Sequence, residues 1–323
     1  MYVGKLTTED LHRLVLSKIK NHRPTTKMGP GVGLDVAYLQ FGDELMAVAS
    51  DPITGAGINI GSLAVLIACN DISAGGGEPL AVMITMLLPP QIKEEEISGI
   101  MEQAQDMATK LNVDILGGHT EITSAVNRVV LSLTAIGRVQ KPLEGIKAGD
   151  AIVMTKSLGL EGVSIIVAEK EEIRAHLSLA EIDDARKMGQ QLSIAKEARI
   201  GLKYGVHFMH DITEGGLVGA LTEMCYESDL GFLVDASRVP IHDVTKKVAS
   251  FYDLDPYQLI SSGSLLMTLS KEKVEALLKE LHAQGIEASH IGEFRLDQRK
   301  ILRFDEDIEV EPKAGDELYK VMG

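Results

Sequence analysis

The sequence predicts a protein of mixed α and β structure (α+β) that is divided into two domains. Its 323 residues exceed what a single hydrophobic core usually organises, so two domains of about 150 residues each are expected. Hydrophobic residues make up 45% of the chain and charged residues 24%, with 31 glycines and only 10 prolines, which is typical of a folded chain. Apolar patterns of helical spacing alternate along the chain with short apolar runs that are typical of strands.

In the first half of the chain, capping and periodicity predict two helices separated by a loop and strands. Thr7 or Thr8 can cap a helix over residues 7–20. The stretch 23–33 is rich in proline and glycine and predicts a loop. Residues 60–74 are apolar on nearly every side, which predicts a buried helix that three consecutive glycines stop. The other predicted elements are strands near 34–41, 45–50, 80–88, 113–116 and 128–139 and a helix that starts near Lys93.

A linker separates this half from the second. The stretch 141–150 places proline, glycine and charged residues between two apolar strands, so the predicted domains span residues 1–142 and 148–323. The second domain is predicted to contain helices near 161–168, 184–204, 217–226 and 271–284 and strands near 151–155, 206–209, 232–234, 264–269 and 290–294. Each half therefore mixes helices with strands.

Charge and cysteine content exclude several classes of function. The formal net charge is −15, from 32 basic and 47 acidic residues, which argues against nucleic acids and anionic membranes as partners. Cys69 and Cys225 lie far apart in apolar segments and fit neither a disulfide framework nor a thiolate metal site. The first residues lack the apolar run of a secretion signal, and no apolar run approaches the length of a membrane span, so we expect a cytoplasmic protein.

Isolated carboxylates stand at the ends of predicted elements in the first half. Asp35 follows the glycine-rich loop, Asp51 ends a strand, and Asp71 lies beside Asn70 on the buried helix. Burying a carboxylate is costly unless cations or donors compensate it, so several such groups would form a site for a hard cation such as magnesium if they converged. Taken singly, each is equally well explained as a turn or helix-end residue, but their joint occurrence beside glycine loops favours the metal site.

GGHTE, the stretch 117–121, offers groups that could bind a phosphate. Gly117 and Gly118 leave the backbone open to an anion, and His119, Thr120 and Glu121 add polar side chains. A lone histidine in a loop is more often structural or solvated than catalytic, and no second histidine nearby gives a zinc spacing. The P-loop and dinucleotide fingerprints are both absent from the sequence.

HDITEGGL, the stretch 210–217, is the corresponding motif of the second half. It places Asp211, Gly215 and Gly216 ahead of a helix whose N-terminal amides could bind an anion with help from the helix dipole. The alternative is that Asp211 and Thr213 are turn and N-cap residues, and composition alone favours that interpretation.

Taken together and in this order, the motifs resemble the family of aminoimidazole ribonucleotide (AIR) synthetase, selenophosphate synthetase, thiamine-monophosphate kinase and the hydrogenase-maturation dehydratase HypE. The resemblance covers nearly the whole chain and leans toward the hydrogenase-maturation members. It rests on ASD at 49–51, NDISAGGGEPL at 70–80, GGHTE at 117–121, GDAIVMTKSLGLEG at 149–162, HDITEGGL at 210–217 and DPYQLISSGSLL at 255–266.

The resemblance implies a homodimer in which the N-terminal domains pair their sheets into a barrel, with ATP and magnesium near that interface and the C-terminal domain closing over them. The residues that it implies for catalysis are Asp71, Asp211 and Lys27, and His119 is a further catalytic candidate to which no motif assigns a role. Those that it implies for binding the nucleotide are Asp35, Asp51, Asn70, Gly117, Gly118, Thr120, Glu121, Gly215 and Gly216. The implied metal ligands are Asp35, Asp51, Asp71 and Asp211.

The chemistry that the family shares is phosphoryl transfer from ATP to an oxygen, usually of an amide or an acid, which needs cations and backbone donors but no covalent nucleophile. Here the sequence ends ELYKVMG, without the terminal cysteine that HypE uses, and stretch 23–33 lacks the cysteine or selenocysteine of selenophosphate synthetase. The paired acids usual near the glycine loop are reduced to Asp35. We therefore expect an ATP-dependent enzyme for an undetermined small-molecule or carrier-bound substrate. The alternative is a non-catalytic ATP-binding paralogue that regulates or scaffolds metalloenzyme maturation.

Overall fold

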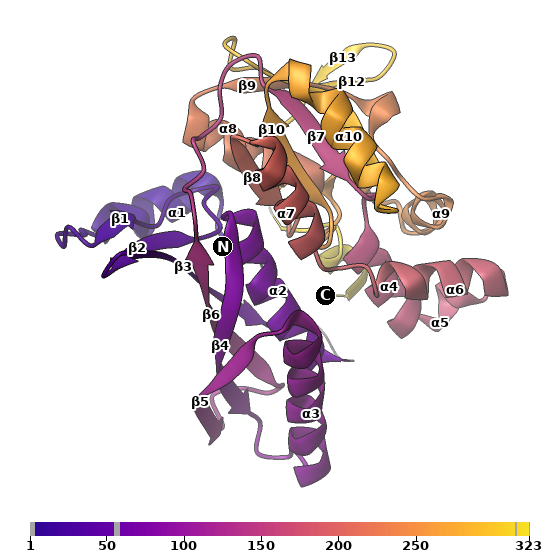
Figure 1. The fold of residues 1–323 in the computed structure, drawn as a ribbon. Helices are drawn as coiled ribbons and strands as arrows, with labels where there is room; N and C mark the ends of the chain where they lie inside the picture. The colour runs from indigo at the N-terminus through magenta and orange to yellow at the C-terminus, as the bar shows by residue number, and fades with distance from the viewer. Residues whose placement is uncertain (1–3, 55–58, 314, 323) are drawn as a thin grey trace. The chain divides into compact units, whose positions relative to one another are not determined.

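The computed structural model describes residues 4–54, 59–313 and 315–322 and is drawn in Figure 1. The chain divides into two compact units. The N-terminal unit comprises Asn21–Gly29 and Asp35–Pro142, and the C-terminal unit comprises the described residues of Met1–Lys20, Pro30–Leu34 and Leu143–Gly323. Each unit contains one sheet together with helices, which confirms the predicted mixed α and β class.

The sheet of the N-terminal unit has six strands in the order β1-β2-β3-β6-β4-β5. The strands are β1 (Thr26–Met28), β2 (Ala37–Phe41), β3 (Glu44–Ile53), β4 (Gly77–Leu88), β5 (Asp114–Ile122) and β6 (Val130–Val139). Only the β4–β5 pair is parallel, because helix α3 (Glu94–Leu111) connects these strands as a crossover. The sheet is open, with β1 and β5 at its edges, so the predicted barrel stays a prediction.

Helix α2 (Ile60–Ala74) has the bounds that the sequence predicts. Thirteen of its fifteen residues are buried, because it packs on the sheet with one face and on α3 with another. Its end is fixed by Gly75, where a Cβ would lie 2.4 Å from Val36, and the hydroxyl of Tyr38 donates to the Gly75 carbonyl at 2.7 Å. Local sequence is sufficient to predict this helix, since its apolar run and its glycine stop are contiguous.

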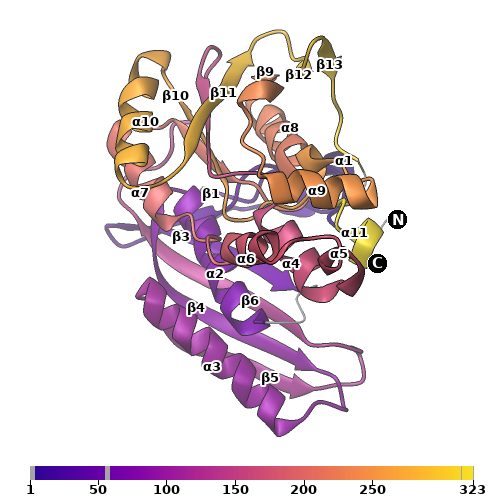
Figure 2. The same ribbon diagram turned by 90° about the vertical axis from the view of Figure 1, so that its right-hand side faces the viewer.

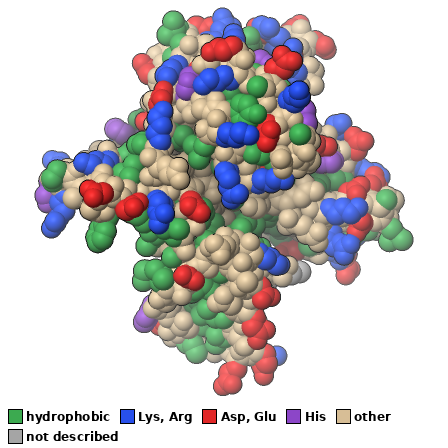
Figure 3. All heavy atoms as spheres, viewed as in Figure 1, with side chains coloured by type: hydrophobic (Ala, Val, Ile, Leu, Met, Phe, Trp, Pro, Cys, Tyr) green, Lys and Arg blue, Asp and Glu red, His purple; other side chains and the backbone are tan. Residues whose placement is uncertain are grey.

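Helix α3 is amphipathic and packs beside α2 on the same face of the sheet (Figure 2). Ile100, Ala104 and Ala108 recur at four-residue spacing and form its buried stripe. Three glutamates lie in its first turn, where their negative charges interact favourably with the positive end of the helix dipole. Acidic side chains gather over the outer side of the helix at the lower right of Figure 3. The opposite face of the sheet carries no helix of this unit within the described residues.

The structure corrects the first two predicted elements. The helix predicted over 7–20 is shorter: α1 (Thr8–Leu14) is followed by a 3₁₀ turn at Leu16–Lys18. Thr7 is its cap, and the Thr7 hydroxyl accepts from the amide of Asp10 at 3.2 Å. The loop predicted over 23–33 contains strand β1, which pairs with β2, so pairing with a later strand overrides the local proline and glycine signal.

The sheet of the C-terminal unit has seven strands in the order β13-β12-β9-β11-β7-β10-β8. The strands are β7 (Ala151–Thr155), β8 (Phe208–Asp211), β9 (Gly231–Asp235), β10 (Leu265–Leu269), β11 (Ala288–Arg295), β12 (Lys300–Arg303) and β13 (Asp307–Glu309). The helices after α1 are α4 (Leu160–Glu169), α5 (Glu171–Arg174), α6 (Leu179–Met188), α7 (Ala195–Tyr204), α8 (Gly216–Ser228), α9 (Asp243–Tyr252), α10 (Val274–Ala283) and α11 (Tyr319–Met322). Fully buried side chains such as Phe232 and Phe294 join α8 to the sheet.

The single helix predicted over 184–204 is wrong. Helix α6 ends at Met188, and α7 begins only at Ala195. The break is held by Lys156, whose Nζ donates to the Ser193 carbonyl at 2.6 Å and pairs with Glu197 at 2.8 Å. Lys156, which lies outside the segment 184–204, thus stabilises the break, so the periodicity of that segment alone cannot predict it.

Several other elements of the C-terminal unit were not predicted. These are α5, α9, β12, β13 and α11. Two of them, β13 and α11, are only three and four residues long, so they carry little periodic signal. Within the described residues, no helix combines the length and the apolar character that crossing a membrane requires.

Candidate functional site

Strand β3 places Asp51 on the face of the sheet that α2 covers. Side chains alternate along a strand, and Ala47 and Ala49 on the same face as Asp51 are buried. Asp51 itself is half-buried near the end of the strand, opposite Leu133 of β6. Ser50 points to the other face, where its hydroxyl lies 3.1 Å from that of Thr134.

Helix α2 places Asn70 and Asp71 in its last turns, where they are 1% and 6% exposed. Asp35 lies near the same end of the helix, because its neighbour Val36 packs against Gly75. Asp35 is half-buried. The N-terminal unit therefore places Asp51 on the helix-covered side of its sheet, Asp71 on the helix that covers it, and Asp35 near the end of that helix.

These three carboxylates do not form a closed cage. Among the described residues, the oxygens of Asp35, Asp51 and Asp71 do not all lie within 4.8 Å of one another. Carboxylates suit magnesium, which keeps several waters and takes substrate phosphates as ligands rather than filling an all-protein cage. The donor set thus fits a metal held jointly with phosphate oxygens, and the metal site stays a prediction.

The stretch 117–121 is not the predicted loop but the second half of strand β5. It pairs in parallel with β4, with Gly118 opposite Ile84. A Cβ at Gly118 would lie 1.7 Å from the Ile84 carbonyl oxygen, and Gly117 and Gly118 adopt φ of +130° and +149°. The glycines therefore allow a close approach between strands, whereas the sequence predicts that they leave the backbone open to a phosphate.

The strand divides its polar residues between the two faces of the sheet. His119 lies opposite Thr85 and shares the open face with Glu121, with 3.6 Å between the His119 Nε2 and Glu121 Oε2 atoms. Thr120 lies opposite Met86 and points to the helix-covered face, as Asp51 does. All of these β5 residues are exposed, since the strand is an edge of the sheet.

Lys27 lies at the other edge of the same sheet. It is the exposed middle residue of β1, and four strands separate β1 from β5. At about 4.8 Å per strand, these edges are roughly 24 Å apart across a flat sheet. The structure therefore does not bring Lys27 and His119 together within one chain.

In the C-terminal unit, Asp211 ends strand β8 and is 2% exposed. It belongs to a buried acidic group with Glu161 and Asp316. Burial raises the pKa of Glu161 to about 7 against a hydrogen bond from Ser262, and the nearby charges of Asp316 and Asp211 add to the rise. The neighbouring His210 has its Nε2 atom 3.1 Å from the Glu223 carboxylate.

The N-terminus of α8 is already occupied by a carboxylate. Asp316 accepts from the amides of Gly215 at 2.7 Å, Ile260 at 3.1 Å and Leu318 at 2.8 Å. The Gly216 amide donates to the Thr213 carbonyl at 3.0 Å. A Cβ at Gly216 would lie 2.7 Å from the Tyr257 carbonyl oxygen, so this glycine serves close packing. The chain thus supplies its own anion where the sequence predicts a bound one.

Glu161 and Asp316 were missed as candidate residues. The signal for Glu161 was present, since an acid between Leu160 and Gly162 in an apolar segment is unusual in a buried helix. Asp316 had no such signal, because its partners Gly215 and Ile260 are distant in the sequence.

Two family models match the chain in order. Residues 33–139 match the N-terminal domain of AIR synthase related proteins, and residues 147–305 match the C-terminal domain. A hydrogenase expression/formation protein of Methanocaldococcus jannaschii is 26% identical over 305 residues, 90% of this chain and 88% of that protein. The carbamoyl dehydratase HypE of Rhizobium leguminosarum is 26% identical over 249 residues, 75% of this chain and 69% of that protein.

Solved structures share the fold over nearly the whole chain. A hydrogenase maturation protein HypE in complex with ATP has a TM-score of 0.72 at 22% identity and covers 97% of this chain and 96% of its own. A ThiL protein complexed with AMPPCP and TMP has a TM-score of 0.74 at 17% identity and covers 97% of this chain and 99% of its own. At these identities the likeness describes the fold.

Proposed function

Because the chain belongs to the AIR synthase-related family, we propose that it is an ATP- and magnesium-dependent enzyme that activates an amide or acid oxygen by phosphoryl transfer. The observation that carries the proposal is the burial of Asn70 and Asp71 in the last turns of α2, beside the strand that bears Asp51. Aspartate and asparagine are rarely this deeply buried, and a helix end alone does not require either residue there. The names of two relatives, a carbamoyl dehydratase and an ATP-bound HypE, support the same chemistry.

The proposed roles follow the residues' positions. Asp35, Asp51 and Asp71 would hold magnesium in the N-terminal unit, and Asp211 is the metal ligand proposed in the C-terminal unit. When bound, magnesium neutralises charge on the transferred phosphoryl group. Thr120 offers a hydroxyl on the same face as Asp51, whereas His119 and Glu121 face the open side. The substrate stays undetermined.

We also propose that the enzyme is a homodimer that forms on the open face of the N-terminal sheet. Lys27 and His119 lie at opposite edges of one sheet, so both can serve one nucleotide only if a second chain contributes one of them. Exposed apolar side chains on that face, such as Leu39 and Met83, support the pairing.

The test is ADP release from Mg-ATP across a panel of purine-pathway, thiamine and carbamoyl substrates. Asp71→Asn keeps the shape of the side chain and removes its charge, so we expect turnover to fall about 100-fold or more. Asp106→Asn, an exposed change on α3 of the same unit, is the matched control and should leave turnover unchanged.

Two outcomes would contradict the proposal. Equal turnover of Asp71→Asn and wild type would remove Asp71 from the site. If the protein binds ATP in a magnesium-dependent way but turns over none of the substrates, the alternative is favoured. That alternative is a non-catalytic paralogue that regulates or scaffolds metalloenzyme maturation.

A further inference from the structure

The loop that joins β8 to α8 is held by residues from two distant parts of the chain. It spans residues 212–215 and follows Asp211, the metal ligand proposed in the C-terminal unit. Its side chains and amides bind segment 4–5 and segment 316–319. Both segments belong to the C-terminal unit, as the loop does. We call these two segments the clasp.

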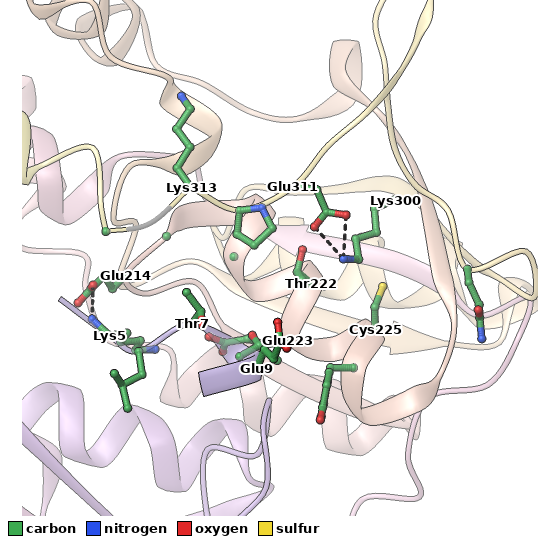
Figure 4. Close-up of a pocket in the computed structure, with 18 of the residues that line it drawn as sticks. Lys5, Thr7, Glu9, Glu214, Thr222, Glu223, Cys225, Lys300, Glu311 and Lys313 are labelled. Carbon is green, nitrogen blue, oxygen red and sulfur yellow. Dashed lines mark hydrogen bonds and ion pairs between the residues drawn. The ribbon is translucent and has the colours of Figure 1, made fainter. Parts of the chain in front are cut away.

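Glu214 joins the two segments of the clasp. Its Oε1 atom accepts from the amide of Lys5 at 2.7 Å, and its Oε2 atom accepts from the hydroxyl of Tyr319 at 3.1 Å. Figure 4 draws the bond between Lys5 and Glu214 as a dashed line. Burial and the charge of Glu214 raise the pKa of Tyr319, so the hydroxyl keeps the proton that it donates. Gly4 permits this close contact, since a Cβ there would lie 2.3 Å from Glu214 Oε1 and 3.0 Å from the Tyr319 ring.

The residues on either side of Glu214 are also bound by the clasp. The ammonium group of Lys5 donates to the Thr213 hydroxyl at 3.2 Å. The amide of Gly215 donates to the Asp316 carboxylate at 2.7 Å. Three consecutive residues of the loop therefore each have a partner in the clasp.

The loop needs partners of this kind, because its own sequence supplies neither a cap nor a stiff backbone. Helix α8 has Gly215 at its N-cap and no side-chain cap, so the carboxylate that binds the Gly215 amide comes from Asp316. Gly215 and Gly216 adopt φ of +88° and +61°, and glycine has more backbone freedom to lose than any other residue. The Ile212 amide still donates to the Ser264 carbonyl at 3.0 Å. Beyond that bond the loop leaves the sheet and reaches the clasp.

Like charges near Asp211 add to the need for this support. Asp211, Asp316 and Glu161 are all buried, at 2%, 5% and 6% exposed. Burial raises the pKa of Glu161, and the charges of Asp316 and Asp211 add to the rise, so the three carboxyl groups lie close enough to repel one another when ionised. The hydrogen bonds of the clasp hold the loop and Asp316 together against this repulsion.

We propose that Glu214 is a positioning residue that joins the two segments of the clasp and thereby holds Asp211 where it can bind magnesium. The inference rests on the proposed function, because that function makes Asp211 a metal ligand. Glu214 acts through the loop, since its two carboxylate oxygens accept from Lys5 and Tyr319.

Hydrogen exchange of the full chain, followed by NMR at single amides, tests the clasp without any turnover. Glu214→Ala removes both accepting oxygens, so the amides of Gly215 and Ile212 should exchange at least about tenfold faster. Tyr319→Phe removes one of the two bonds and should give a smaller increase. It should have no further effect in the Glu214→Ala background, because both changes remove the same bond. The Ile152 amide, in the buried strand β7, should exchange as in wild type.

ADP release as a function of magnesium concentration separates positioning from a merely structural role. A displaced Asp211 binds magnesium more weakly, so Glu214→Ala should need about tenfold more magnesium for half-maximal turnover and keep its rate at saturating magnesium within about twofold. Glu214→Gln should be intermediate, since its single oxygen can still accept from Lys5. The control is Glu275→Gln, an exposed acid on α10 of the same unit, which should match wild type in both measurements.

The proposal is overturned by either of two results. Unchanged exchange of the Ile212 amide in Glu214→Ala would show that the clasp does not support the end of β8. A loss of rate at every magnesium concentration, with the half-saturating concentration unchanged, would make the clasp purely structural. If wild type releases no ADP, the proposed function fails by itself, and the magnesium dependence of ATP binding in wild type and Glu214→Ala decides the role of Glu214 in the same way.

Discussion

Glu161 is a buried carboxyl group of the C-terminal unit whose pKa lies near neutral pH. It is 6% exposed, and its Oε2 atom makes no hydrogen bond with the described residues. Burial raises its pKa to about 7, against a hydrogen bond from Ser262, and the nearby Asp316 and Asp211 charges act in the same direction as burial. The unit therefore keeps a proton on Glu161 that an exposed glutamate would lose near pH 4.5.

Glu161→Gln should make the protein more stable at high pH and have little such effect at low pH. The pKa in the folded state exceeds that in the unfolded state, so between about 4.5 and 7 the folded state binds more protons and stability falls as pH rises. The penalty is complete above pH 7 and is on the order of 3 kcal/mol. Urea unfolding in EDTA at pH 5 and pH 8 should show a gain for Glu161→Gln that grows with pH.

Glu275→Gln, an exposed change in the same unit, provides the baseline for that measurement. A gain of the same size at both pH values would mean that Glu161 ionises normally in the folded protein.

At the scale of residues, the sequence predicts the carboxylates that stand out locally. Asp51 and Asp71 interrupt apolar segments, and the structure places both on the helix-covered side of one sheet. Asp316 could not be found in this way, because its role depends on amides of Gly215 and Ile260 that only the folded chain brings to it. How Lys27 and His119 lie relative to each other also depends on strand order, which local patterns do not specify.

At the scale of elements, prediction succeeds where a segment carries its own boundaries. Helix α2 was predicted with its observed bounds because its apolar run and glycine stop are adjacent. The break between α6 and α7 was missed, because Lys156 from the end of β7 holds it. The sequence predicts a loop from residue 117 onward, since paired glycines usually mark a turn, whereas in the structure they permit close pairing of β5 with β4.

The glycines of β5 give a matched pair of substitutions. A Cβ at Gly118 would lie 1.7 Å from the Ile84 carbonyl oxygen, whereas a Cβ at Gly117 would meet nothing within 4 Å. Both residues have a φ that alanine rarely adopts, so both changes introduce backbone strain. We expect Gly117→Ala to lower the free energy of unfolding by about 1–2 kcal/mol and Gly118→Ala by about 3 kcal/mol or more.

Urea unfolding followed by circular dichroism measures the difference, and hydrogen exchange of the β5 amides shows whether the strand separates from β4. If the two variants lose the same stability, the contact with Ile84 does not constrain the strand, and the glycine pair must be explained by a role outside the fold.

At the scale of the molecule, the N-terminal sheet is covered on one face only. Helices α2 and α3 bury one face of the sheet. Along each strand, side chains that point to this buried face alternate with side chains that point to the open face. Leu39 is 39% exposed, Phe41 76% and Met83 45%. Apolar side chains gathered on a sheet face in this way are typical of a protein interface, and the proposed homodimer would bring Lys27 of one chain and His119 of another to one nucleotide.

If the proposed homodimer forms on this face, Met83→Glu should convert it into a monomer and lower the proposed ATP turnover with it. The change places a charge in the middle of the open face, where pairing with a second sheet would bury it without a partner. Light scattering coupled to gel filtration gives the mass of each variant, with Leu179→Glu as the control because Leu179 is 85% exposed in the other unit. A monomer that keeps full turnover would show that one chain holds a complete site, and then Lys27 and His119 cannot both serve the same nucleotide.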